Sequence, residues 1–357
     1  MRLTLYVLRL VGLRILGAGA ILLAVLQILD LLEITPEIIQ RGLGFGGILH
    51  YASLRLPRMI DQAAPLSVLA GAIFAFIKLA AESEFVAMRA IGVSAYRLVL
   101  MALPAALAVL AVHLVAVQVI APRTDAALQA WWTATAPPPN PADKDAKPKE
   151  KAVRIGDDVF VAKSDDPTGR TLKDVRIYRR DTEGRLTERV GAPVATYGPQ
   201  GWRLGDPQFV RFGKAGATAG QASEITLAPG FEPADVQNLF FGDQAISAAA
   251  AKRALAGGGT QRPPSYYATR LQGALAGPIG DLLMLLLAAP IAMASFRGGQ
   301  GAVFAAGSLA AGLLFMVVNG LLAALGESGA VGPLLAAWTA PAVFAALGAS
   351  VLLKLEG

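Results

Sequence analysis

Cysteine is absent from the 357 residues, and only two histidines, His50 and His113, are present. The lack of cysteine excludes disulfides, thiol catalysis and cysteine-ligated metal sites, and two histidines so far apart do not suggest a histidine-based metal site. Charge is also scarce. Charged residues make up 16% of the chain and hydrophobic residues 54%, whereas an average soluble domain carries roughly 25% charged residues. Much of the surface must therefore face something other than water.

The few charges are distributed unevenly along the chain. About twenty of the 32 Lys and Arg lie between Arg123 and Arg262, in a block that also contains many acids. Because the sign of this block is nearly balanced, the net charge of +6 is better explained by membrane topology than by nucleic acid binding. The sequence thus consists of two apolar blocks, 1–121 and 268–357, on either side of a water-soluble block, 122–267.

Six segments are long and apolar enough to cross a bilayer, which needs about 20 residues. The run from Ile15 to Leu32 is too long for the apolar part of a signal peptide, so it predicts a retained first helix. Pro36 and the glycine-rich stretch 42–47 are expected to separate the first span from the second. The predicted spans are 13–33, 60–80, 98–121, 271–295, 300–325 and 331–353.

The short loops predict the orientation of these spans. One side carries most of the basic residues, namely Arg2, Arg9, Arg14, Lys78, Arg89, Arg97, Arg297 and Lys354. Because basic residues accumulate on the cytoplasmic side, both termini are expected in the cytoplasm. Residues 122–267 then lie outside, in the periplasm of a Gram-negative cell.

The middle block predicts an all-β domain. After a Pro-rich arm at 137–151, short alternating runs such as 159–162, 175–178 and 209–212 are separated by turn residues. Seven or more short strands favour an antiparallel sandwich or jelly roll, followed by a short helix from Ser247 to Leu255. The predicted fold is therefore a helical membrane protein of three plus three spans with an inserted periplasmic, jelly-roll-like β domain.

The loop between the second and third spans predicts a two-turn helix over about 83–92. Ser83 can cap its N-terminus, Glu84 suits the positive end of the helix dipole, and Gly92 is placed to end the helix.

One edge of this predicted helix is apolar. Phe85, Met88 and Ile91 recur at intervals of three residues, and Arg89 lies beside them. Such an edge suits insertion into a groove of a partner protein. A helix lying on lipid head groups would show the same pattern.

Three polar residues fall inside the predicted spans. Asp281, in the fourth span, is costly in a bilayer and normally faces protein or water. A helix break capped by Asp281, a bond to a partner subunit, or proton coupling would each account for it. His113 and Asn319 are expected to be hydrogen-bonded between helices.

Several of these motifs resemble one family, the lipopolysaccharide-export permeases LptF and LptG. Pro65 and residues 69–71 of the second span, followed by the loop 83–94, carry the resemblance. Residues 119–122, Pro278 and Pro290 extend it, and the three-domain-three layout matches over the whole length. Further matching stretches, which are more similar to LptG than to LptF, are 54–58, 175–178 and 201–204.

The resemblance implies a set of partners. An LptF–LptG pair forms a cavity open to the outer leaflet, and a dimeric cytoplasmic LptB-like ATPase drives it. Lipopolysaccharide is extracted from the leaflet and passed through jelly-roll domains to a periplasmic bridge, and an LptC-like single-span protein joins beside the first span. No G-x-x-x-x-G-K-[ST] motif occurs in this chain, so ATP and Mg²⁺ are expected on the partner ATPase and no cofactor on this chain.

The resemblance also implies roles for individual residues. The helix at 83–92 corresponds to the coupling helix, with Glu84 leading it, Phe85 and Met88 filling a groove of the ATPase, and Arg89 on the rim of that groove. Lipopolysaccharide carries phosphates, which basic residues at the outer interface would bind. The candidates are Arg41, Arg55, Arg58 and Arg123, each of which could instead serve as a membrane anchor.

The sequence departs from the family pattern at the outer end of the first span, where residues 30–33 are acidic rather than basic. Two other functions therefore stay open beside the export permease. They are an ATP-independent secondary transporter and a membrane anchor for a periplasmic adaptor. An enzyme is not expected, because no nucleophile, base and orienting group occur in a recognisable motif.

Overall fold

The computed structural model describes residues 2–136, 150–155, 158–164, 166, 168–181, 183, 185–213, 216–221, 232–236, 247–256, 260, 262–291 and 301–356. The chain divides into two compact units, Met1–Asp125 with Ala268–Gly357, and Ala126–Tyr267. Of the Pro-rich arm predicted at 137–151, all but the last two residues lie outside the described residues.

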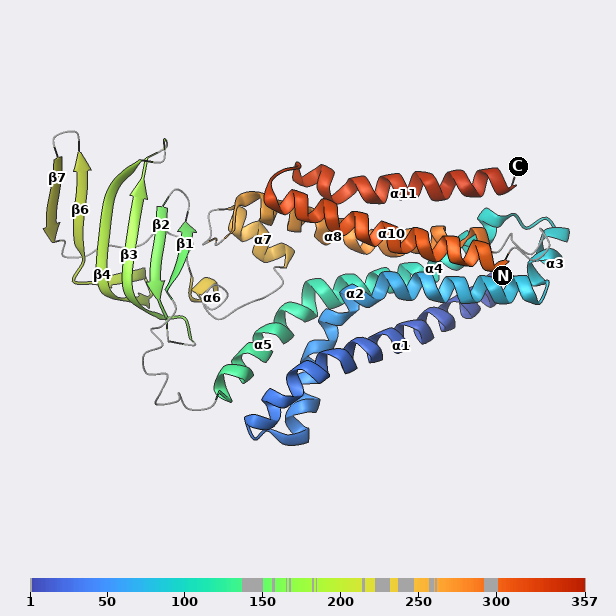
Figure 1. Cartoon of the computed structure of the whole chain (residues 1–357), viewed down its shortest axis with the longest axis horizontal. Helices are drawn as coiled ribbons and strands as arrows, with labels where there is room; N and C mark the ends of the chain where they lie inside the picture. Colours follow the sequence, from blue (N-terminus) through green and yellow to red (C-terminus); the bar gives the residue numbers. More distant parts are fainter. Residues whose placement is uncertain are drawn as a thin grey trace. The chain divides into compact units, whose positions relative to one another are not determined.

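The first unit is a bundle of long helices whose two chain ends lie at the same end of the bundle as the short helix α3 (Figure 1). Within the described part of the chain, six helical stretches are long and apolar enough to span a membrane, which confirms the predicted number. The elements are α1 (Arg2–Gln40), α2 (Gly44–Ala81), α3 (Glu84–Ala90), α4 (Ala95–Val115), the π-helix η1 (Ala116–Ile120), α5 (Ala121–Ala134), α8 (Pro264–Ala288), α10 (Gly301–Ser328) and α11 (Pro333–Glu356). The parts of α5 and α8 that fall between Ala126 and Tyr267 belong to the second unit.

The first two helices are longer than their predicted spans. α1 continues through Pro36, which was expected to end it, and α2 already begins at Gly44 rather than near residue 60. Membrane helices tolerate an internal proline because neighbouring groups replace its missing hydrogen bond. The chain instead reverses at Gly42, whose positive φ of 74° is accessible to glycine without steric cost.

The third span also extends beyond its predicted end at residue 121. Helical structure passes through Pro122 and ends at Ala134. The turn before Pro122 is the π-helix η1, in which the N–H of Ala121 donates to the carbonyl of Ala116. A proline ring clashes with the carbonyl four residues before it, and the wider π turn relieves that clash. The proline therefore modifies the helix rather than terminating it.

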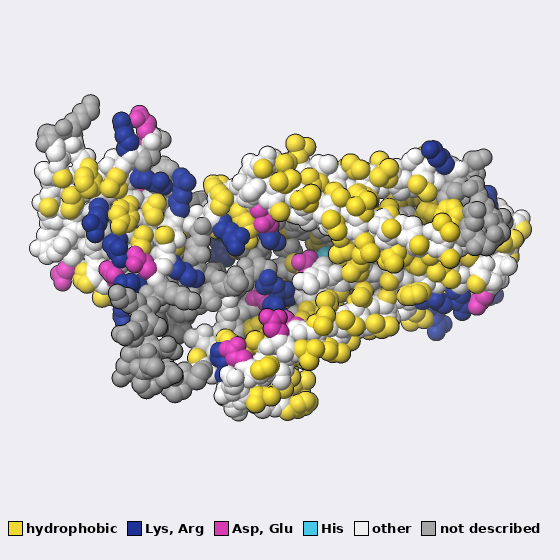
Figure 2. Space-filling model, in the orientation of Figure 1, with side chains coloured by type: hydrophobic (Ala, Val, Ile, Leu, Met, Phe, Trp, Pro, Cys, Tyr) yellow, Lys and Arg dark blue, Asp and Glu magenta, His cyan; other side chains and the backbone are white. Residues whose placement is uncertain are grey.

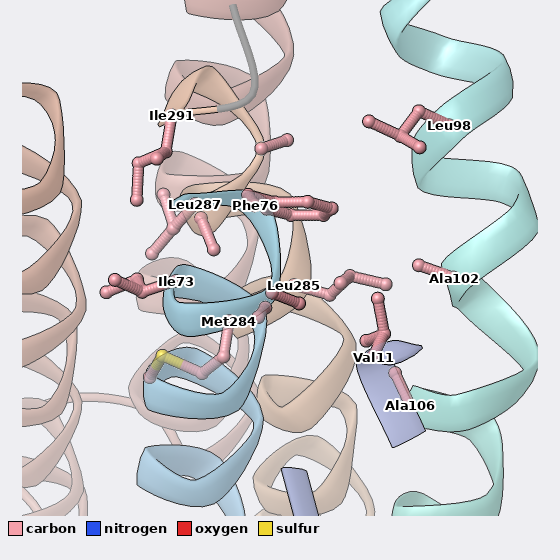
Figure 3. Packing of buried hydrophobic residues seen from close by; sticks show 14 of the residues in the cluster. Val11, Ile73, Phe76, Leu98, Ala102, Ala106, Met284, Leu285, Leu287 and Ile291 are labelled. Atoms are coloured by element: carbon pink, nitrogen blue, oxygen red, sulfur yellow. The ribbon is translucent and has the colours of Figure 1, made fainter. Parts of the chain in front are cut away.

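Buried apolar side chains from both halves of the chain form one core in this bundle (Figure 3). Val11 of α1, Phe76 of α2, Leu98 of α4 and Leu285 of α8 belong to it. α1 and α2 approach closely at Gly71 in α2, where an added Cβ would contact the Cα and N of Ile15 in α1. Small residues at helix crossings allow this close packing in membranes. The apolar surface that remains exposed covers the bundle in Figure 2.

The second unit contains the predicted β domain, and its described strands form a single antiparallel sheet. Its order is β1-β2-β3-β4-β6-β7, with β5 also pairing with β4. The strands are β1 (Lys151–Ile155), β2 (Asp158–Lys163), β3 (Thr171–Arg180), β4 (Leu186–Gly198), β5 (Gly201–Gly205), β6 (Gln208–Gly213) and β7 (Gly216–Gln221). The prediction of an inserted antiparallel β domain is confirmed.

The long strand β4 changes partner along its length. Glu188 to Gly191 pair with β6, and Val194 to Gly198 pair with β5. Pro193 lies between these two stretches, and because proline cannot donate a ladder hydrogen bond it is suited to such a change of partner. One face of the sheet buries Phe160, Trp202 and other apolar side chains.

Two short helices, α6 (Pro233–Val236) and α7 (Ala248–Leu255), follow the sheet in the sequence. The predicted helix at Ser247 to Leu255 is confirmed, and the Ser247 side chain caps it by accepting from the N–H of Ala250.

Candidate functional sites

The short helix α3 lies in the loop where the sequence predicts a docking helix. It ends in a Schellman motif, with the N–H of Val93 donating to the carbonyl of Met88 at 3.0 Å and that of Gly92 to Arg89 at 2.9 Å. Gly92 has a φ of 85°, as expected for the glycine that follows a helix end. The predicted terminating role of Gly92 is confirmed.

The N-terminus of α3 differs from the prediction. Ser83 occupies the N-cap position, but its φ of 56° is left-handed and its side chain makes no capping hydrogen bond. The expected serine cap is therefore wrong. Glu84 instead accepts from the hydroxyl of Tyr6 in α1 at 2.7 and 2.8 Å. This carboxylate thus connects α3 to the first helix as well as lying at the positive helix end.

The apolar edge predicted on α3 is divided between two faces. Phe85 is fully buried and Met88 nearly so, both in the core of the bundle, whereas Ile91 is 75% exposed. Phe85 and Met88 therefore point toward the long helices and pack between these helices and α3. The large exposed apolar side chains of the helix and its C-cap are Val86 and Ile91, and Arg89 is exposed as well.

The four arginines predicted at the outer interface have different surroundings. Arg41 pairs with Glu37 one turn before it at 2.7 Å. Arg123, on α5, is exposed. Arg55 and Arg58 lie on α2, one turn apart, and each pairs with a carboxylate from another helix.

The partners of Arg55 and Arg58 are acids within the apolar helices. Arg55 Nε lies 3.3 Å from Asp30 Oδ1 of α1, and Arg58 Nη1 lies 3.3 Å from Asp125 Oδ2 of α5. Both arginines line a pocket of about 230 Å³ between α1 and α2, together with Leu26, Leu29, Asp30, Glu33, Met59 and Gln62. The charges that line this pocket are balanced, since two arginines face two acids.

A third group of polar residues lies between α2, α4 and α8. His113 of α4 places Nδ1 2.8 Å from Asp281 Oδ2 of α8, and Nε2 3.0 Å from Asp61 Oδ1 of α2. The expectation that His113 is hydrogen-bonded between helices is confirmed. The helix break proposed at Asp281 is wrong, because α8 is continuous from Pro264 to Ala288. Asp281 is instead held by a side chain of its own chain.

The sequence did not single out Asp61, Asp125 or Tyr6. Asp61 lies near the start of the span predicted at 60–80, where an acid is unremarkable at a membrane interface. Its position became significant only because α2 begins at Gly44 and Asp61 is therefore in the interior of the helix. Asn319 of α10 is partly buried.

The described residues contain no group of three or more His, Cys, Asp or Glu side chains with the geometry to hold a metal ion. What the structure presents is a multi-pass helical bundle with polar clusters between its helices, interrupted by a separate β unit. This architecture defines a membrane protein with a large inserted domain.

A comparison with family models makes the assignment specific. The model of the lipopolysaccharide export system permease LptF/LptG matches residues 5–354. The chain therefore belongs to this family, whose members are components of a transport system rather than enzymes. A search among curated proteins gave no match.

Proposed function

We propose that this chain is the LptG-like transmembrane subunit of an ABC-type exporter that extracts lipopolysaccharide from the outer leaflet of the inner membrane. The family match over residues 5–354 is the observation that carries the proposal. The partners are an LptF-like paralogue, an LptB-like ATPase dimer that binds ATP and Mg²⁺, and an LptC-like single-span protein. Both termini and α3 lie at one end of the bundle, which supports a common cytoplasmic position for them (Figure 1).

Within this proposal, α3 is the coupling helix that contacts the ATPase. Its buried side holds Phe85 and Met88 in the core, so a movement of α3 is transmitted directly to the long helices. Its outer side offers Val86 and Ile91 to a groove of the partner. Tyr6 and Glu84 connect the same helix to α1.

Substitution of Ile91 tests the docking surface without disturbing the core. Burying an isoleucine side chain contributes about 1.5–3 kcal/mol, so Ile91→Asp is expected to weaken binding of the ATPase by roughly tenfold or more. Affinity is measured by titrating the purified ATPase against the full chain in nanodiscs. The matched control is Phe45→Asp, at an exposed position near the opposite end of α2. Equal affinities for the two variants would contradict docking at α3.

The pocket between α1 and α2 is the proposed contact for the lipopolysaccharide head group. Arg55 and Arg58 can turn toward a phosphate, which they would bind in charge-assisted hydrogen bonds. Both are already paired with acids, so an incoming phosphate competes with Asp30 and Asp125. Such competition favours release after binding, which a transport cycle requires. The β domain would then accept the lipid on its way to the periplasmic bridge.

A further inference from the structure

The cluster of Asp61, His113 and Asp281 connects the two halves of the chain inside the bundle. Asp61 and His113 belong to the first three spans, and Asp281 belongs to the second three. His113 and Asp281 are essentially inaccessible, while the side chain of Asp61 is 60% exposed. The cluster thus has one buried end and one open end.

The geometry of this cluster determines how many protons it needs. Both ring nitrogens of His113 lie within hydrogen-bonding distance of a carboxylate oxygen, at 2.8 and 3.0 Å. Each of these contacts requires one proton, but a neutral imidazole carries only one N–H and a carboxylate carries none. A neutral histidine between two carboxylates would therefore place a lone pair of the ring against a lone pair of an acid.

We propose that Asp61, His113 and Asp281 form a proton-binding site that holds one proton more than a neutral histidine with two ionised acids. The additional proton lies on the ring, which then donates from both nitrogens, or on one of the two carboxyl groups. In either case it comes from water through Asp61, the exposed member, and the net charge of the cluster falls from two negative charges to one. Burial of Asp281 favours this reduction of charge.

Among the described residues, the charged side chains on the neighbouring turns are already in ion pairs. One turn before Asp61, Arg58 is already paired with Asp125, and on α1 the acid Asp30 is paired with Arg55. α10 packs Phe315 against Gly280, next to Asp281. The sequence of α10 holds no charged residue before Glu327, and that of α11 none before Lys354. Within the described residues, a bound proton is therefore the positive charge that balances the carboxylates of Asp61 and Asp281.

Loss of the additional proton has a structural consequence. One of the two contacts to His113 must then break, and the broken contact is the one to Asp61, because Asp61 can be hydrated whereas Asp281 cannot. The tie between α2 and α4 opens while the tie between α4 and α8 persists. This inference concerns proton binding alone and does not depend on the transported substrate.

The two histidines of the chain make a direct test possible. A His50→Gln variant leaves His113 as the sole histidine, so ¹⁵N NMR of the labelled full chain in nanodiscs reports its ring protons without overlap. At neutral pH we expect the NMR spectrum to show two protonated ring nitrogens. If it shows one, we expect an infrared band of a protonated carboxyl group, and Asp61→Asn or Asp281→Asn should remove that band. A single protonated nitrogen without such a band would overturn the proposal.

A second variant separates proton binding from a purely structural role. In Asp61→Asn the side-chain amide can donate to the unprotonated nitrogen of a neutral ring. The additional proton is then no longer required. We expect proton affinity to fall roughly tenfold or more, as for loss of a charged hydrogen-bond partner, and the proton to leave at lower pH. The control Glu82→Gln alters an exposed acid at the C-cap of α2 and should leave the titration unchanged. An unchanged titration in Asp61→Asn would contradict the assignment.

Discussion

Two arginines of α2 each pair with an acid from a neighbouring helix. Arg55 lies against Asp30 and Arg58 against Asp125, so both arginines contact a neighbouring helix. An ion pair in a partly dry site costs desolvation, which good geometry and further hydrogen bonds must offset. At 3.3 Å both pairs are longer than the 2.7 Å pair of Arg41 with Glu37. This geometry suits side chains that exchange partners.

Asp30→Asn is therefore expected to strengthen binding of lipopolysaccharide. The substitution removes a competitor for Arg55, and a gain of up to about 1.4 kcal/mol corresponds to a tenfold tighter complex. Arg55→Ala should weaken binding by a similar factor. Affinity for detergent-solubilised lipopolysaccharide is measured by microscale thermophoresis with the full chain. Glu82→Gln, which removes the partner of Lys78 at the other end of α2, serves as the control. Weaker binding by Asp30→Asn would contradict the proposed pocket.

Helix lengths explain much of what the sequence could and could not predict. The existence of six spans follows from long apolar runs, because the bilayer requires them. Their ends were less predictable, since Pro36 and Pro122 lie within continuous helices. A proline signals a helix end in water but is tolerated inside membrane helices. The orientation of α3 was also beyond sequence reasoning, because the spacing of Phe85, Met88 and Ile91 does not reveal which side meets the bundle.

The contact between α1 and α2 depends on Gly71. Even one methyl group at this position would contact the backbone of Ile15, so Gly71→Ala is expected to destabilise the packing by about 1–3 kcal/mol. The chain has no cysteine, which permits a specific assay. A Cβ on Gly19 would lie 3.5 Å from that of Ser67, within the range of about 3.5–4.5 Å for a disulfide. In a Gly19→Cys, Ser67→Cys chain, Gly71→Ala should slow cross-linking, and Gly46→Ala, which meets open space, should not.

The hairpin between β3 and β4 should be sensitive to acid. The backbone N–H of Arg185, followed by its guanidinium group, lowers the pKa of the Asp181 carboxyl below its ordinary value. Because the pKa is lower in the folded state than the unfolded value of about 3.9, the ionised carboxylate stabilises the hairpin above that pH. This stabilisation disappears as the pH falls through the folded-state pKa.

Hydrogen exchange measures this effect in the full chain. Protection of the Arg185 amide, corrected for the intrinsic pH dependence of exchange, should fall on acidification. In Asp181→Asn it should be low at neutral pH and change little with acid. If the Arg185 amide of Asp181→Asn loses protection on acidification as it does in the unsubstituted chain, a group other than Asp181 causes the acid sensitivity.

The whole molecule combines a membrane bundle with a β unit, and the family match extends over both. The sequence predicted this division because charge and apolar runs separate so clearly at about residues 122 and 267. It also predicted His113 and Asp281 as polar residues inside the spans, but not that they meet each other and Asp61, since three helices bring these residues together from distant parts of the chain. The proposed cycle requires that the bundle hold lipopolysaccharide between α1 and α2 until the ATPase moves α3.

Photo-crosslinking in the reconstituted complex tests this central claim most directly. A photoreactive residue replaces Gln62, which lines the pocket, and in a control chain it replaces Leu335, an exposed residue at the start of α11. We expect a lipopolysaccharide adduct at Gln62 that clearly exceeds the one at Leu335 and that declines when ATP is added. Equal adducts at the two positions, or an adduct at Gln62 that ATP leaves unchanged, would contradict the claim.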